Sequence, residues 1–202
     1  MTGPYALNTA PPPDGFRGTV FLDRDGVLNE NLVDHVKSPA EVTILAGAVE
    51  AVRRITEAGV FPVVVTNQEV VGVGTITLAQ AVEVQQTVGQ PFAQAGAPLP
   101  AAYICPHAPD GGCTCRKPAP GMIHTAAREL RLDLGRSCLV GDAMTDVAAA
   151  RAAGIPAVLV LTGRGRAQLA GATASERAGL IVAESLADAV DTVLDLVGVK
   201  PS

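Results

Sequence analysis

Residues 18–30 read GTVFLDRDGVLNE and place two aspartates at the end of an apolar run. The run Gly18–Leu22 is short and rich in β-branched and aromatic residues, which is typical of a buried strand in a parallel sheet. Gly26 then allows the backbone to turn sharply. We therefore expect Asp23 and Asp25 at the carboxyl edge of the sheet, where open α/β sheets bind their ligands.

The spacing of the two aspartates indicates a cation. Side chains two residues apart share one face of a strand, so the carboxylates of Asp23 and Asp25 repel unless a cation or a shared proton intervenes. Mg²⁺ is a hard cation that prefers such oxygen ligands. On its own the pair is more typical of an acidic turn after a strand, so the interpretation depends on the motifs that follow.

Strand-like apolar runs alternate with alanine-rich helical stretches along the 202 residues. We expect strands at 19–23, 61–66, 101–105, 137–141, 157–161 and 180–182. We expect helices at 48–58, 78–95, 120–130, 145–153 and 186–197. The alternation predicts an α/β fold with three layers, a Rossmann-like and mostly parallel sheet with helices on both faces.

Composition limits the domain organisation. Hydrophobic residues make up 48% of the chain but aromatic residues only 3%, with no tryptophan, so the core is expected to be aliphatic. Without an internal repeat or a low-complexity linker, residues 18–200 are predicted to form a single domain. Residues 1–17, which contain three consecutive prolines, are expected to be a loose N-terminal arm.

Charge and hydropathy exclude several classes of partner. The net charge of −5 and the pI near 5.1 argue against a nucleic-acid partner or an anionic membrane surface. No apolar run reaches the ~18 residues of a membrane-spanning helix, and no signal peptide is visible. We expect a monomeric cytoplasmic protein whose partner is a small molecule.

Three cysteines and one histidine lie within residues 105–115, CPHAPDGGCTC, which we call the zinc loop. Three thiolates and one imidazole are a tetrahedral ligand set that closes a structural zinc site. Cys105, His107, Cys113 and Cys115 are therefore predicted to bind Zn²⁺ rather than to form a disulfide or remain free. Cys138 begins an apolar strand and is expected in the core.

Two further segments offer groups for a phosphate. Thr66 and Asn67 end the second predicted strand, and a hydroxyl and an amide there can donate hydrogen bonds to phosphate oxygens. Arg116 and Lys117 directly follow the zinc loop, which would hold them in place. A fixed lysine can neutralise a phosphoryl group and an attacking carboxylate together.

The segment GDAMTD at 141–146 adds two carboxylates after another predicted strand. Asp142 and Asp146 are four residues apart, one helical turn. Both can point toward the sheet edge that carries Asp23. Asp142 would complete the metal site, and Asp146 would support it by holding Lys117.

In this order and spacing, FLDRDGVLN, TNQ, RKP and GDAMTD resemble the haloacid dehalogenase superfamily of phosphohydrolases. The zinc loop followed by RKPAPGM narrows the resemblance to a branch without a cap domain. That branch contains D-glycero-D-manno-heptose 1,7-bisphosphate 7-phosphatases and histidinol-phosphate phosphatases, and the PGM and LTGRG segments are more similar to the heptose enzymes. The resemblance thus implies hydrolysis of a phosphorylated heptose within carbohydrate metabolism.

The resemblance also implies roles for the site residues. Asp23 would be the nucleophile that forms an aspartyl-phosphate, and Asp25 the general acid and then the general base. Mg²⁺ would be held by Asp23, the Asp25 carbonyl and Asp142. Substrate contacts would come from Asn29, Thr66, Asn67, Arg116 and Lys117.

The loop after TNQ departs from the heptose pattern. Val73 stands where the resemblance leads us to expect an arginine, and Glu69 adds a negative charge. Arg164 and Arg166 could compensate. A phosphatase for histidinol phosphate or another small sugar phosphate therefore stays open as an alternative, and a non-catalytic zinc-stabilised binding protein as a more distant one.

Overall fold

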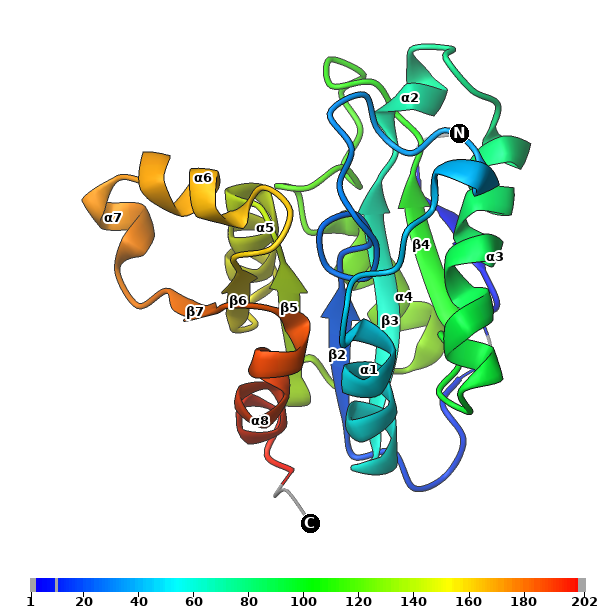
Figure 1. Cartoon of the computed structure of the whole chain (residues 1–202). Helices are drawn as coiled ribbons and strands as arrows, with labels where there is room; N and C mark the ends of the chain where they lie inside the picture. The colour runs from blue at the N-terminus through cyan, green and yellow to red at the C-terminus, as the bar shows by residue number, and fades with distance from the viewer. Residues whose placement is uncertain (1–2, 10, 200–202) are drawn as a thin grey trace.

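The computed structural model describes residues 3–9 and 11–199, and its elements form three layers (Figure 1). Within these residues one sheet holds seven strands in the order β1-β4-β3-β2-β5-β6-β7. Neighbouring strands are parallel, except that β1 is antiparallel to β4. The strands are β1 Tyr5–Leu7, β2 Gly18–Leu22, β3 Val60–Asn67, β4 Ala101–Cys105, β5 Ser137–Gly141, β6 Ala157–Val160 and β7 Ile181–Ala183.

The predicted α/β fold with a mostly parallel sheet is confirmed. The helices are α1 Ala48–Glu57, α2 Glu69–Gly72, α3 Leu78–Gln94, α4 Gly121–Leu130, α5 Met144–Ala153, α6 Gly165–Gly171, α7 Ala174–Arg177 and α8 Leu186–Leu196. Two short 3-10 turns cover Pro39–Glu41 and Leu134–Arg136. Among the described helices, none is long and apolar enough to cross a membrane.

Alternation along β2 divides the core into two layers. Val20 and Leu22 face a cluster that contains buried side chains of α1, α3 and α8, whereas Phe21 faces a cluster with those of α4 and α5. Figure 1 accordingly shows α1 in front of the sheet and α4 behind it. A strand buried on both faces has apolar residues at every position, which explains its continuous hydrophobic run.

Local signals explain where the longest helix begins. The Thr77 hydroxyl accepts a hydrogen bond from the Gln80 amide, and the Gln80 side chain accepts one from the Thr77 amide. This capping box satisfies two backbone donors at the start of α3. Ala81, Val84 and Val88 then follow at helical spacing and are buried.

Within the described residues, the N-terminal arm that was expected to be loose is attached to the sheet at two points. Tyr5–Leu7 forms an edge strand along β4, and Phe16 packs edge-on against Phe61 at 5.1 Å between ring centroids. Without β1, β4 would be the edge of the sheet. Pairing with β1 satisfies backbone groups of β4 that would otherwise be unpaired. Residues 1, 2 and 10, and position 200 at the end of the predicted domain, lie outside the described residues.

The sheet register brings the predicted site residues to one edge. Leu22 pairs with Val64 on one side and with Val140 on the other, and the Asp23 amide donates to the Val140 carbonyl at 2.9 Å. The residues that follow β2, β3 and β5 are therefore neighbours in space although they are far apart in the chain.

Replacing Phe92 with alanine tests the core that supports this edge. Phe92 is fully buried on α3, so Phe92→Ala should lower the free energy of unfolding by roughly 3–5 kcal/mol. Urea denaturation followed by circular dichroism measures the change. The exposed Gln86 on the same helix is the control, because Gln86→Ala should change stability by less than about 0.5 kcal/mol.

Candidate functional site

Lys117 lies at the centre of the carboxyl edge, buried between two carboxylates. Its Nζ is 2.8 Å from Asp23 Oδ1 and 2.6 Å from Asp146 Oδ1, and it donates to the Val65 carbonyl at 2.9 Å. Burial alone would lower the pKa of Lys117, but the charges of Asp146 and Asp23 outweigh it and raise the pKa. A permanent cation is thereby fixed beside Asp23.

Asp23 is balanced between opposing effects. Burial and the charge of Asp146 raise the pKa of its carboxyl, and Lys117 lowers it. The net result is a pKa raised to about 6. Asp23 Oδ1 also accepts a hydrogen bond from the Arg24 amide at 2.8 Å. The carboxylate is held in one orientation and is poorly solvated, two properties that suit a nucleophile.

Asp25 is held as a carboxylate by three side chains. The Arg24 guanidinium donates to both of its oxygens at 3.0 and 2.8 Å, and Asn29 and Gln68 donate at 2.8 and 2.9 Å. Burial raises the pKa of Asp25, but Arg24 and these donors lower it overall. Asn29 was predicted to contact substrate, yet it is fully buried and binds Asp25 instead.

Arg24 and Gln68 were absent from the predicted site residues. Arg24 is fully buried, and Gln68 also donates to the Thr66 hydroxyl at 2.9 Å. The position of Arg24 between two aspartates in a buried stretch is a signal that could have identified it. Gln68 was visible only as the last residue of the TNQ motif.

Asp142 meets the glycine-rich turns at the same edge. Its Oδ2 accepts from the Arg164 amide at 2.8 Å and from the Asn31 side chain at 3.1 Å. A Cβ at Gly26 or Gly163 would lie 2.1 or 2.2 Å from that oxygen, so only glycine fits at either position.

The carboxylates form a group that fits a hard cation. One carboxylate oxygen each from Asp23, Asp142 and Asp146 lies within 4.8 Å of the others. Asp142 Oδ1 is buried without a hydrogen-bond partner, and burial together with the Asp23 charge raises the pKa of Asp142. A divalent metal would satisfy this oxygen and reverse the repulsion.

A cavity opens above these groups and contains most of the predicted substrate contacts. It is lined by Asp23, Asp25, Asn31, His35, Thr66, Asn67, Glu69, Arg116, Lys117, Thr145 and Arg164. Asn67 also exchanges two hydrogen bonds of 3.0 Å with the Lys117 backbone, which ties the RKP segment to β3. Arg166 instead pairs with the exposed Glu184. Asn31, His35 and Thr145 were missed: no quoted motif contains Asn31 or His35, and in GDAMTD only the two aspartates were considered.

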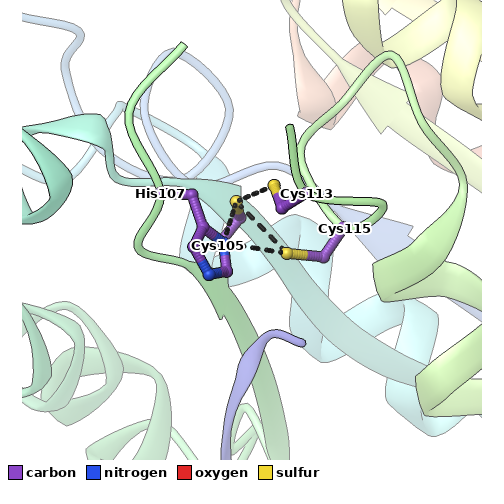
Figure 2. Close-up of side chains that lie close together, drawn as sticks. All are labelled: Cys105, His107, Cys113 and Cys115. Carbon is purple, nitrogen blue, oxygen red and sulfur yellow. Dashed lines mark hydrogen bonds between the residues drawn. The ribbon is translucent and has the colours of Figure 1, made fainter. Parts of the chain in front are cut away.

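The zinc loop brings its four predicted ligands together (Figure 2). Cys105 Sγ is 3.7 Å from Cys113 Sγ and 3.4 Å from Cys115 Sγ, and His107 Nδ1 is 3.2 Å from Cys115 Sγ. All four ligand atoms lie within 4.8 Å of one another. They converge from the end of β4 and from the loop toward α4, an arrangement that fits tetrahedral zinc.

The Cys105 thiol of the cluster differs from the thiol of Cys138, which lies outside it. A hydrogen bond from the Cys115 thiol lowers the pKa of Cys105 to about 5, so a thiolate is available as a ligand at neutral pH. Burial raises the pKa of Cys138 to about 12. Cys138 is a core residue, as predicted.

Comparisons with known proteins find a matching family model and similar phosphatases. A HAD-hydrolase-like family model matches residues 114–189. The D-glycero-beta-D-manno-heptose-1,7-bisphosphate 7-phosphatase of Bordetella bronchiseptica is 39% identical over 87% of this chain and 97% of that protein. The D-glycero-D-manno-heptose-1,7-bisphosphate 7-phosphatase of Thermosynechococcus vestitus is 37% identical over 88% and 95%, respectively.

A solved structure shares the fold over most of this chain. The crystal structure of the D,D-heptose 1,7-bisphosphate phosphatase from B. bronchiseptica, complexed with magnesium and phosphate, superposes with a TM-score of 0.81. The match has 38% sequence identity and covers 88% of this chain and 98% of that one.

Replacing Cys113 with serine tests the zinc loop. The wild-type protein should contain about one zinc per chain, and Cys113→Ser should lose most of it and increase hydrogen exchange in the loop. Mass spectrometry measures metal content and exchange. Cys138→Ala is the control and should retain zinc. Wild-type protein without zinc would contradict the assignment.

Proposed function

Because the chain belongs to the haloacid dehalogenase-like phosphatases that include the heptose-1,7-bisphosphate 7-phosphatases, we propose that it removes the 7-phosphate of D-glycero-D-manno-heptose 1,7-bisphosphate. The observation that carries the proposal is Asp23, which is fixed beside the Lys117 ammonium at the base of the cavity. The relatives support the substrate by their names, and the site supports the chemistry.

In the first step Asp23 attacks. One of its carboxylate oxygens bonds to phosphorus, the P–O bond of the ester breaks, and the sugar oxygen leaves with a proton from Asp25. Lys117 neutralises charge on the phosphoryl oxygens. In the second step water attacks phosphorus, Asp25 accepts its proton, and the Asp23–phosphate bond breaks to release inorganic phosphate.

The acid role of Asp25 requires a change on substrate binding. Its pKa is lowered mainly because Arg24 opposes the effect of burial, so the free carboxyl is ionised at neutral pH. A phosphate dianion nearby favours protonation, because like charges raise the pKa of an acid. Asn29 and Gln68 keep the carboxyl oriented throughout.

Asp23, Asp142 and the Asp25 carbonyl would hold the magnesium ion. Magnesium would supply Lewis-acid polarisation of the phosphoryl group and would offset its negative charge. Asp146 contributes through Lys117, whose ammonium it holds at 2.6 Å. This contact supports a positioning role for Asp146 that leaves Asp23 available for attack.

The rest of the cavity supplies substrate contacts. Thr66 and Lys117 would bind the transferring phosphoryl group, and Asn67 and Arg116 would orient the sugar. Glu69 favours a second candidate, a phosphatase for histidinol phosphate or another small monoester, because it adds a negative charge to the mouth of the cavity. Cytoplasmic location, a monomeric state and a single domain stay predictions from the sequence.

A substrate panel separates the candidates. Phosphate release with Mg²⁺ should favour heptose 1,7-bisphosphate over histidinol phosphate and over simple phosphates of sugars other than the heptose by about 100-fold in kcat/KM, or about 2.7 kcal/mol of transition-state binding. Steady-state kinetics on the zinc-loaded protein measure it. Equal activity across the panel would keep the phosphatase and reject the heptose substrate.

The nucleophile is tested by Asp23→Asn. An amide cannot form the aspartyl-phosphate, so turnover should fall by at least about 10³-fold, while circular dichroism and zinc content stay unchanged. Asp195→Asn, an exposed aspartate on α8, is the control for the loss of one charge. Turnover retained by the Asp23 variant would remove Asp23 from this role.

A further inference from the structure

Glu69 connects three separate segments at the mouth of the cavity. It lies at the start of α2 and forms an ion pair with Arg116, which follows the zinc loop. Its other oxygen, Oε1, is 3.4 Å from Nε2 of His35, in the loop after β2. All three side chains line the cavity, so this contact is part of the surface that a substrate meets.

The ion pair restricts what Arg116 can bind. The side chains of Arg116 and Glu69 are 22% and 27% exposed, so water screens the pair less than a surface pair. Arg116 Nη2 donates to Glu69, and Arg116 Nη1 is buried without a hydrogen-bond partner. One terminal nitrogen of the guanidinium is therefore already paired with a carboxylate, and the other is buried.

The other cations of the cavity are also paired. Lys117 contacts Asp23 and Asp146, and the Arg164 guanidinium lies 3.6 Å from Asp142. Among the described residues that line the cavity, each lysine or arginine thus has a carboxylate partner. In the proposed mechanism Lys117 contacts the reacting phosphoryl group. Arg116 is the cation whose charge Glu69 alone neutralises.

We propose that Glu69 is a specificity-determining residue, which withholds Arg116 and His35 from a second phosphate at the far end of the substrate. The inference rests on the proposed phosphatase function and specifies its substrate class. The enzyme hydrolyses the terminal phosphate of a sugar monophosphate and of the matching bisphosphate with similar kcat/KM. A second phosphate gains no net charge attraction from the paired Arg116, so it adds little to transition-state binding.

The test compares one substrate pair, heptose 1,7-bisphosphate and heptose 7-phosphate, in wild-type and Glu69→Gln protein. For the wild type the ratio of the two kcat/KM values should be below about 10, and Glu69→Gln should raise this ratio at least about tenfold. The gain should appear mainly in KM for the bisphosphate. It should shrink between 0.05 and 0.5 M salt, because ions screen the attraction of the released guanidinium.

Two controls test whether the gain comes from the released Arg116. Glu184 also pairs with an arginine but is exposed and away from the cavity, so Glu184→Gln removes the same charge and should leave the ratio unchanged. In the double variant Glu69→Gln/Arg116→Gln the gain should disappear. A gain that persists there would overturn the role of Arg116.

The outcomes separate this inference from the proposed function. If the wild type does not hydrolyse either heptose ester, the heptose substrate is rejected, and the same ratio is measured with fructose 1,6-bisphosphate and fructose 6-phosphate. Glu69→Ala provides a second variant, and circular dichroism and zinc content establish that both variants are folded. A ratio that neither folded variant raises tenfold, on either substrate pair, overturns the inference.

Discussion

The contact of the Lys117 ammonium with Asp23, Asp146 and the Val65 carbonyl is the interaction on which the site depends. An unpaired charge at this depth would be strongly unfavourable, so neither the lysine nor the carboxylates could be buried separately. Asp23 directly follows β2, Val65 lies in β3, Asp146 lies in the first turn of α5, and Lys117 follows the zinc loop. The contact therefore joins the sheet edge and the loop into one site.

The zinc loop solves a mechanical problem for that lysine. The segment between β4 and α4 has no helix or strand to stiffen it, and the cation must be positioned to a fraction of an ångström. Four convergent ligand atoms hold the loop up to Cys115, and two hydrogen bonds with Asn67 hold the Lys117 backbone itself. Little freedom remains between the metal cluster and the ammonium.

The hydrophobic periodicity of the sequence made the fold predictable. Motifs with characteristic spacing made the main residues of the site predictable. The strands 101–105 and 137–141 have the predicted bounds, and the four zinc ligands converge as expected. The edge strand Tyr5–Leu7 was missed because three residues carry no periodic signal and depend on β4 for pairing. Asn29 was misplaced because the resemblance gave its neighbourhood but not its side-chain direction.

Gly26 and Gly163 lie far apart in the chain and almost touch, since a Cβ at Gly163 would come within 2.6 Å of Gly26 Cα. Both also crowd Asp142 Oδ2, so no side chain at one position can be accommodated by changing the other. During evolution neither glycine can be replaced by a larger residue, either alone or together with the other. The two turns on either side of Asp142 must then be inherited as one unit, even where the loops around them are free to diversify.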